Sequence, residues 1–329
     1  MRLLVLGGTV YLSRAVAELA AARGHDVTVA TRGRNGEPPS GTEHVIADRA
    51  TVDGLSALRG RAFDAVVDVA WIPAHVKNAI EVLGEGAGHW THVSSCSAYS
   101  DDATPGQTPA TGPTHDPAPY DADEVDAERF GPYKVACENQ VRERFGDRAL
   151  VIRPGLIIGP GDRIDRVGHW FRRIAEGGEI LAPGAPEETV QWIDVRDLAA
   201  WIVDAAEKRL AGVFDAICPP VTRGEWLSSI AAAYGVEATF TWVSRELLDE
   251  HGVQPWMGEE SLGLWLPLPE YAGFMKRDVT ASLAAGMTNR PIGDTALAWR
   301  EWDTPGHPLR AGVSRQKEAE VLAAHHARE

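Results

Sequence analysis

The sequence has few cysteines and no long hydrophobic run. Its 329 residues include three cysteines, with no CxxC pair and no cysteine–histidine spacing typical of zinc. We therefore expect neither a disulfide framework nor a metal site. No stretch approaches the roughly 18 apolar residues that suit a membrane span. The opening residues, MRLLVLGG, form too short an apolar run for a signal peptide, so we expect a cytoplasmic protein that does not enter membranes.

Basic residues are also scarce. The sequence has 32 Lys and Arg against 47 Asp and Glu, a formal net charge of −15. This balance repels phosphate backbones and anionic lipid surfaces, so we expect a small-molecule substrate and no nucleic-acid partner. The composition, 44% hydrophobic and 24% charged, is typical of a globular protein.

Short β-rich runs alternate with segments of helical periodicity through the first half of the chain. The strand-like runs are 2–6, 26–30, 44–47, 63–70, 90–94 and 150–153, and the helical segments are 13–23, 74–83 and 127–145. This alternation predicts an α/β protein with a Rossmann-type doubly wound parallel sheet. We predict a nucleotide-binding domain over 1–155, to which elements near 190–220 return. A smaller C-terminal substrate lobe is expected over 156–315, followed by a frayed tail at 316–329.

A glycine turn follows the first strand run, where a dinucleotide-binding fold places its glycines. Such a turn lets the backbone approach a pyrophosphate, and the next helix supplies free N–H groups. The match is partial, because Val10 and Ser13 stand where glycines are usual, and a plain strand–turn–helix junction is the alternative. The predicted cofactor contacts here are Gly7, Gly8, Thr9, Tyr11, Leu12 and Ser13.

The end of the second strand run favours NADP(H) over NAD(H). An NAD site usually has a carboxylate there, whereas Thr31 is followed here by Arg32, Gly33 and Arg34. A guanidinium can pair with the 2′-phosphate of NADP; the alternative is two solvated loop arginines. Asp48, past the third strand run, either borders the adenine or caps a loop.

A set of later motifs resembles the extended or atypical short-chain dehydrogenase/reductase superfamily. They are SSCSAY at 94–99, FGPYK at 130–134, RPG at 153–155 and QWIDVRDL at 191–198. Within it the chain resembles an actinobacterial NAD-dependent epimerase/dehydratase subgroup that includes reductases and isoflavone reductase-like proteins. The resemblance implies a substrate-polarising serine at Ser95 and a lysine that holds the nicotinamide ribose at Lys134. It also implies cofactor contacts at Ala70 and Pro154, and a homodimer formed through helices near 77–86 and 127–145.

The position of the family's catalytic tyrosine holds Phe130, four residues before Lys134. A phenyl ring cannot transfer the proton that accompanies hydride transfer. Three explanations remain open. Tyr133 supplies the phenol; Lys134, a carboxylate such as Asp126 or Glu128, or a substrate group with water moves the proton; or redox turnover has been lost.

Ser95, Ser97, His169 and Trp170 are the predicted substrate contacts, although for His169 a solvated loop position is the favoured alternative. These features favour an NADP(H)-dependent reductase of a carbonyl or imine in a small organic molecule, such as a natural product, with an atypical proton donor. The alternatives are a sugar-nucleotide epimerase or dehydratase, and a catalytically impaired nucleotide-binding or ligand-binding protein.

Overall fold

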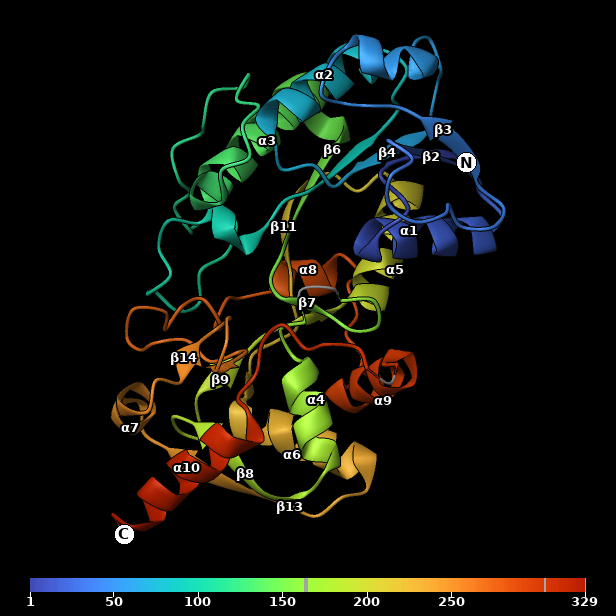
Figure 1. Cartoon of the computed structure of the whole chain (residues 1–329). Coiled ribbons are helices and arrows are strands. Elements are labelled where there is room, and N and C mark those ends of the chain that lie inside the picture. Colours follow the sequence, from blue (N-terminus) through green and yellow to red (C-terminus); the bar gives the residue numbers. More distant parts are fainter. Residues whose placement is uncertain (163–164, 305, 329) are drawn as a thin grey trace.

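A seven-stranded parallel sheet forms the N-terminal half of the molecule (Figure 1). The computed structural model describes residues 1–162, 165–304 and 306–328. In space the strand order is β11-β6-β5-β4-β1-β2-β3. The strands are β1 (Arg2–Leu6), β2 (Asp26–Thr31), β3 (Glu43–Ile46), β4 (Ala65–Asp68), β5 (Trp90–Val93), β6 (Ala149–Pro154) and β11 (Gly212–Ala216). The order reverses between β1 and β4, and doubly wound folds bind their ligands at that switch point. The predicted Rossmann-type α/β fold is thereby confirmed.

Helices cover both faces of this sheet. The helices α1 (Tyr11–Ala22) and α5 (Val195–Lys208) pack on one face, and α2 (Pro73–Leu83) and α3 (Phe130–Phe145) pack on the other. Because successive side chains of a strand point to opposite faces, Leu3 and Val5 join the first core and Leu4 and Leu6 join the second. The fully buried strands thus read as continuous apolar runs in the sequence.

The C-terminal lobe has its own core below the sheet in Figure 1. Its helices are α4 (Gly168–Ala175), α6 (Arg223–Tyr234), α7 (Arg245–Glu250), α9 (Ile292–Trp302) and α10 (Arg315–His326), whereas α8 (Thr280–Ala284) packs against β11 of the sheet. The parallel pair β8 (Gly178–Pro183) and β13 (Ala238–Val243) is its longest strand pairing. Its two-residue strands are β7 (Ile157–Ile158), β9 (Thr189–Val190), β10 (Ile193–Asp194), β12 (Val221–Thr222), β14 (Gln254–Pro255) and β15 (Ser261–Leu262). The buried tryptophans of this core are Trp170, Trp192, Trp226, Trp265 and Trp299.

Short 3₁₀ helices complete the fold at 53–58, 96–98, 127–129 and 146–148. The loop 101–124 contains no helix or strand. It is nevertheless anchored to the lobe, because Asp102 O accepts hydrogen bonds from the amides of Gly273 and Phe274 at 2.8 and 3.0 Å. This loop therefore connects the sheet to the C-terminal lobe.

The tail expected at 316–329 as a charged, frayed helix is mostly helix α10, which is docked rather than frayed, and residue 329 lies outside the described part of the chain. Ser314 caps the helix by accepting from Lys317 N at 3.1 Å. Glu318 is buried and accepts from Arg173 Nε at 2.7 Å, while Val321 joins the lobe core. A buried ion pair with a residue 145 positions away cannot be inferred from the charged character of the segment alone.

All three cysteines are free and buried, and each lies in a different core. Cys218 belongs to the lobe core, Cys96 to the core under α1 and α5, and Cys137 to the core under α2 and α3. Burial raises the pKa of Cys137 and of Cys218 to about 12 and that of Cys96 further still.

No helix in the described part of the chain combines the length and the apolar character needed to cross a bilayer.

Candidate functional site

The turn between β1 and α1 exposes backbone amides at the carboxyl edge of the sheet. Gly7 and Gly8 have φ values of 128° and 107°, a region that other residues rarely adopt. A Cβ atom on Gly8 would lie 2.5 Å from Cγ1 of Val29, so glycine also lets the turn pack against β2. Val10 occupies the N-cap of α1 and provides no side-chain cap. The first amides of α1 are therefore available to an anion.

Ser13 closes this turn internally. Its Oγ donates to Val10 O at 2.8 Å, and the side chain is buried. A glycine at this position would lack that bond, so the departure from the glycine pattern preserves the turn.

An outer cavity of about 220 Å³ lies beside the turn, over the ends of β2 and β3. The predicted residues in its lining are Gly7, Thr9, Ser13, Arg32, Arg34 and Asp48. Arg49, also in the lining, is engaged, because its Nη1 donates to Asp68 at 2.7 Å. Arg32 and Arg34 are exposed and form no hydrogen bond or ion pair within the described residues. Two cations thus remain available where an adenosine phosphate would lie.

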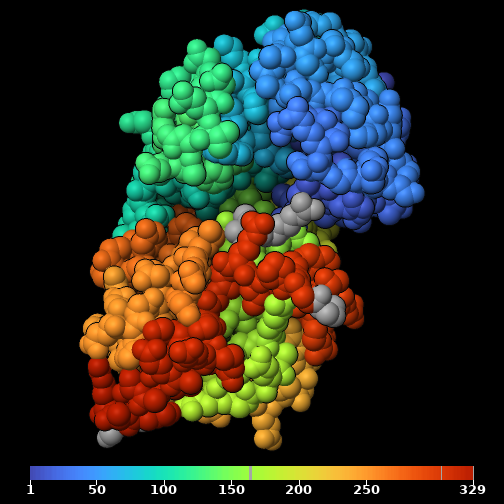
Figure 2. All heavy atoms as spheres, in the orientation of Figure 1, coloured from blue at the N-terminus to red at the C-terminus, as the bar shows by residue number. Residues whose placement is uncertain are grey.

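An inner cavity of about 360 Å³ lies where the two halves of the molecule meet. Figure 2 shows a hollow between the blue and green half and the red and orange half. The lining includes Val10, Tyr11, Leu12, Ser13, Trp71, Ser95, Ser97, Phe130, Lys134, Pro154, Asp162, Arg166, Trp256 and Phe274. Val10 and Ser13 line both cavities. The two cavities therefore extend to either side of the glycine turn.

Lys134 reaches the inner cavity from the second turn of α3. Its Nζ donates to the carbonyl oxygens of Val93 at 2.7 Å and Ala70 at 2.9 Å. An ammonium has three N–H donors, so one is left for a ligand. The side chain is 4% exposed, and its burial lowers the pKa of Lys134 to about 8. The predicted residue Ala70 thus acts through its carbonyl oxygen, by holding this lysine.

Ser95 and Ser97 lie together at the end of β5 and both line the inner cavity. Ser95 Oγ accepts from Ser97 N at 3.0 Å and donates to Ser97 Oγ at 3.1 Å. Phe130 lines the same cavity, with its ring centroid 5.7 Å from Lys134 Nζ. One cavity therefore brings together the serine pair, the lysine and the phenyl ring, the positions that the resemblance to the family singles out.

Tyr133 lies away from this group. It is 1% exposed, packs in a small core with Ile72 and Ala118, and lines none of the cavities found in the described part of the chain. Asp126 is also elsewhere, because its Oδ1 accepts from Glu128 N at 3.0 Å and so caps a 3₁₀ turn. Of the groups considered for proton transfer, the structure places Lys134 in the inner cavity and Glu128 in the neighbouring one described next.

A third cavity, of about 630 Å³, adjoins the inner one. Both cavities are lined by Ser97, Phe130, Trp256 and Phe274. The remaining lining includes Tyr99, Asp102, His115, Glu128 and Tyr271. Sequence reasoning missed Asp102 and His115, because they come from the aperiodic loop 101–124. Burial raises the pKa of Asp102.

His169 and Trp170 are placed differently from the prediction. His169 lies in α4 beside a separate cavity lined by 309–314, and burial lowers its pKa to about 4. Trp170 is 1% exposed, and its Nε1 donates to Gly263 O at 2.8 Å in the lobe core. The segment after residue 167 is a helix rather than an extended substrate loop, so both rings turn into the lobe.

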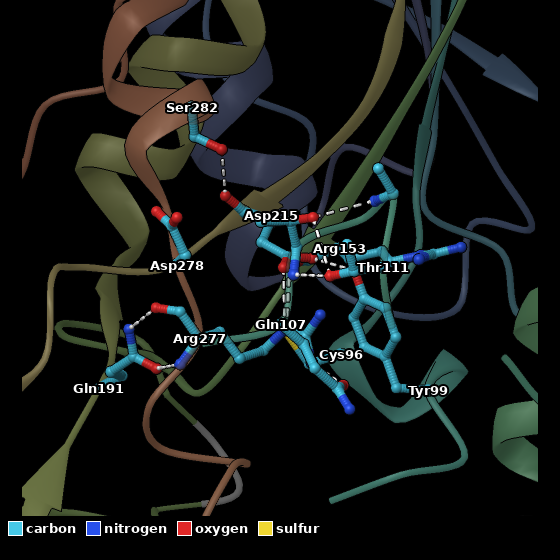
Figure 3. A network of polar contacts seen from close by, with 12 residues as sticks. Cys96, Tyr99, Gln107, Thr111, Arg153, Gln191, Asp215, Arg277, Asp278 and Ser282 are labelled. Atoms are coloured by element: carbon cyan, nitrogen blue, oxygen red, sulfur yellow. Dashed lines mark hydrogen bonds and ion pairs between the residues drawn. The ribbon is translucent and has the colours of Figure 1, made fainter. Parts of the chain in front are cut away.

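A buried polar network supports the wall between the cavities and the lobe (Figure 3). Tyr99 Oη donates to Asp215 Oδ1 at 2.7 Å, and Arg277 Nε donates to Asp215 Oδ2 at 2.8 Å. The guanidinium of Arg277 lies 3.4 Å from the centre of the Tyr99 ring. Arg153 also stacks on this ring, at 4.5 Å, and is paired with Glu138. Tyr99 and Cys96 in this network line the cavities from behind the serine pair.

The residues present fit a dinucleotide. The uncapped amides of α1 and the glycine backbone suit a pyrophosphate, the unpaired Arg32 and Arg34 suit an adenosine phosphate, and the remaining N–H donor of Lys134 suits a ribose hydroxyl. Within the described residues no group of three or more His, Cys, Asp or Glu side chains could hold a metal ion.

Comparison with known proteins gives a consistent family match. The model of the NAD dependent epimerase/dehydratase family matches residues 3–215. The Bos taurus epimerase family protein SDR39U1 is 28% identical over 268 residues, which cover 71% of this chain and 81% of that protein. The Homo sapiens protein of the same name is 28% identical over 270 residues, covering 72% and 82%.

The solved structures that share the fold include two enzymes of bacterial origin. UDP-N-acetylglucosamine 4-epimerase from Bacillus cereus superposes with a TM-score of 0.66 at 17% identity, covering 94% of this chain and 99% of that chain. The Bordetella bronchiseptica enzyme WbmH, solved in complex with NAD⁺, has a TM-score of 0.60 at 16% identity, covering 92% and 97%.

Proposed function

The chain belongs to the NAD dependent epimerase/dehydratase family, and on this premise we propose that it is an NADP(H)-dependent reductase of a carbonyl or imine group in a small organic molecule. The single observation that carries the proposal is the meeting of Ser95, Lys134 and Phe130 in one cavity that adjoins the glycine turn. The narrower assignment to a reductase-like actinobacterial subgroup is part of this proposal. We further propose that the protein acts in the cytoplasm as a homodimer paired through α2 and α3.

The outer cavity supports the preference for NADP(H). The end of β2 carries no carboxylate that would bond the ribose hydroxyls of NAD, and Arg32 and Arg34 line the cavity without partners of their own. A guanidinium pairs with a phosphate through two parallel hydrogen bonds. The 2′-phosphate of NADP would satisfy them.

The bound nicotinamide would supply the hydride. Ser95 Oγ would turn its hydroxyl hydrogen from Ser97 Oγ to the ligand and donate to the oxygen or nitrogen of the reacting double bond. Lys134 Nζ would use its one free N–H to hold a ribose hydroxyl and would pass the proton that the product needs through that hydroxyl. A pKa of about 8 leaves the ammonium protonated at neutral pH yet able to act as an acid. The apolar rings of Trp256 and Phe274 line the third cavity, where the rest of the substrate would lie.

A sugar-nucleotide epimerase is the second candidate, because the similar solved structures include a UDP-N-acetylglucosamine 4-epimerase. Against it, the described lining of the third cavity contains the carboxyl groups of Asp102 and Glu128 and no lysine or arginine. A nucleoside diphosphate carries negative charge that those carboxylates would repel. Binding of UDP-glucose stronger than binding of uncharged carbonyl compounds would favour the epimerase. Cofactor binding without turnover of any compound would favour a binding protein.

The proposal is tested by titrating the protein with NADPH and with NADH, following energy transfer from Trp71 and Trp256, which line the inner cavity. We expect NADPH to bind more tightly. Replacing both Arg32 and Arg34 by Ala should weaken NADPH at least tenfold and leave NADH unchanged. The matched control is Arg59→Ala, an exposed arginine outside both cavities. Equal affinities for the two cofactors in the wild type would contradict the NADP(H) assignment.

A further inference from the structure

Arg166 is a charged side chain that finds no hydrogen-bonding partner among the residues that the structure describes. It lines the inner cavity, and within the described residues its guanidinium forms no hydrogen bond and no ion pair. Its Nε is shielded from solvent without an acceptor. A guanidinium carries five N–H donors in a fixed fork, and leaving buried donors of a charged group unpaired costs free energy. We therefore expect a bound ligand to provide the hydrogen-bond acceptor for Arg166.

The loop that carries Arg166 lies against the glycine turn. A Cβ atom on Gly161 would stand 3.5 Å from Cδ2 of Tyr11, the first residue of α1. Burial lowers the pKa of Arg166, whereas the nearby groups of Asp162 and Tyr11, which line the same cavity, raise it. The guanidinium also lies 5.8 Å from the centre of the Trp256 ring, a cation–π contact that helps to hold it. Arg166 therefore faces the first turn of α1 across the inner cavity.

Two anionic groups could satisfy this guanidinium: the pyrophosphate of the dinucleotide or an acidic group of the substrate. The position of Arg166 favours the pyrophosphate, because it lines the inner cavity beside Tyr11 and does not line the third cavity. Val10 adds a second reason. A glycine at this position usually allows close approach of the backbone to the pyrophosphate. Because Val10 hinders that approach, a cation on the opposite side would strengthen the binding of the pyrophosphate to the amides of α1.

We propose that Arg166 binds the pyrophosphate of the dinucleotide from the side opposite the amides of α1, so that the cofactor joins the C-terminal lobe to the sheet. This inference rests on the proposed function, since it assumes that the chain binds a dinucleotide. It adds a cofactor-binding residue from the second half of the chain, beyond the glycine turn and Lys134.

The test compares ligands that contain a pyrophosphate with one that lacks it. NADPH and 2′-phospho-ADP-ribose carry the pyrophosphate, whereas adenosine 2′,5′-bisphosphate keeps the 2′-phosphate but has a 5′-monophosphate in place of the pyrophosphate. We expect Arg166→Gln to weaken the first two by roughly tenfold or more and the third by much less. Arg166→Lys, which retains the charge but not the fork, should recover part of the loss. Arg59→Gln is the control for loss of one positive charge, and thermal unfolding checks that each variant is folded.

The outcomes separate the two proposals. If the wild type binds NADPH and Arg166→Gln binds it equally well, the pyrophosphate contact is overturned while the proposed function stands. If cofactor binding is unchanged but the KM for the carbonyl or imine substrate rises, Arg166 binds the substrate rather than the pyrophosphate. If the wild type binds none of the three ligands, both proposals are overturned. An equal loss for all three ligands would place Arg166 at a phosphate that all three share, the 2′-phosphate or the adenosine-side 5′-phosphate. That result would also overturn the inference that Arg166 binds the whole pyrophosphate.

Discussion

Lys134 gives the free energy of unfolding a specific pH dependence. Burial lowers the pKa of this ammonium to about 8 in the folded chain, whereas its ordinary value is about 10.4. Between these values the unfolded chain binds more protons, so stability rises with pH, by about 3 kcal/mol in total. Below pH 8 both states are protonated and the cost of burying the charge is fully present.

Urea unfolding between pH 7 and pH 10.5, for the wild type and for Lys134→Met, measures this contribution. The difference between the two profiles cancels the titration of other groups. We expect the wild type to gain stability relative to the variant over that interval. Profiles that stay parallel would mean that Lys134 keeps an ordinary pKa in the folded chain.

The sequence predicts residues of the site where a local motif positions them. Gly7, Ser95 and Lys134 follow directly from a strand end or a helix position, and each lines the cavity or turn expected of it. Arg166 and His115 were not found, because the distant segments that bring them to the cavities have no local sequence signal. The departure at Phe130 was visible, but only the packing of the first turns of α3 shows that Tyr133 points elsewhere.

The contact between β11 and the segment at 277 depends on one carboxylate. Asp215 is fully buried and accepts from both Tyr99 and Arg277. Asp215→Asn removes its charge and leaves the guanidinium of Arg277 buried without a counterion. We expect a loss of about 3 to 5 kcal/mol in the free energy of unfolding, measured by urea denaturation.

A matched control is available on the surface. Asp204→Asn breaks the partly exposed pair with Arg23, which should cost less than about 1 kcal/mol. If both variants lost the same amount, the buried network would not contribute more to stability than a surface ion pair. Circular dichroism of each variant checks that the comparison is made between folded proteins.

Most elements of the sheet could be predicted from the sequence, and several elements of the lobe could not. The sequence predicts the run Arg2–Leu6 with its observed bounds, and the helix predicted over 74–83 is observed as Pro73–Leu83. Two-residue strands such as β7 and β9 are too short to show a period. The pairing of β8 with β13 joins segments about 60 residues apart and depends on tertiary packing alone.

Across the whole molecule, the net charge of −15 disfavours binding of nucleic acids. An acidic surface repels polyanions over a distance that shrinks as salt is added. We expect no retention of labelled RNA or DNA in a filter-binding assay at low salt, where attraction to a basic patch would be strongest. Retention that weakens as salt is added would reveal a local basic surface and contradict this expectation.

The three buried thiols have a consequence for observing motion. Each thiol lies in a different core, and burial keeps it protonated. A thiol reagent can therefore modify Cys137 or Cys218 only when that core opens, whereas Cys96 also borders the inner cavity. The labelling rate at Cys218 then reports opening of the lobe, while Cys96 and Cys137 report the two faces of the sheet separately. The chain thus carries one native probe for each of its three larger cores, and a ligand that joins the halves would slow the labelling of Cys218 and Cys96 without any added label.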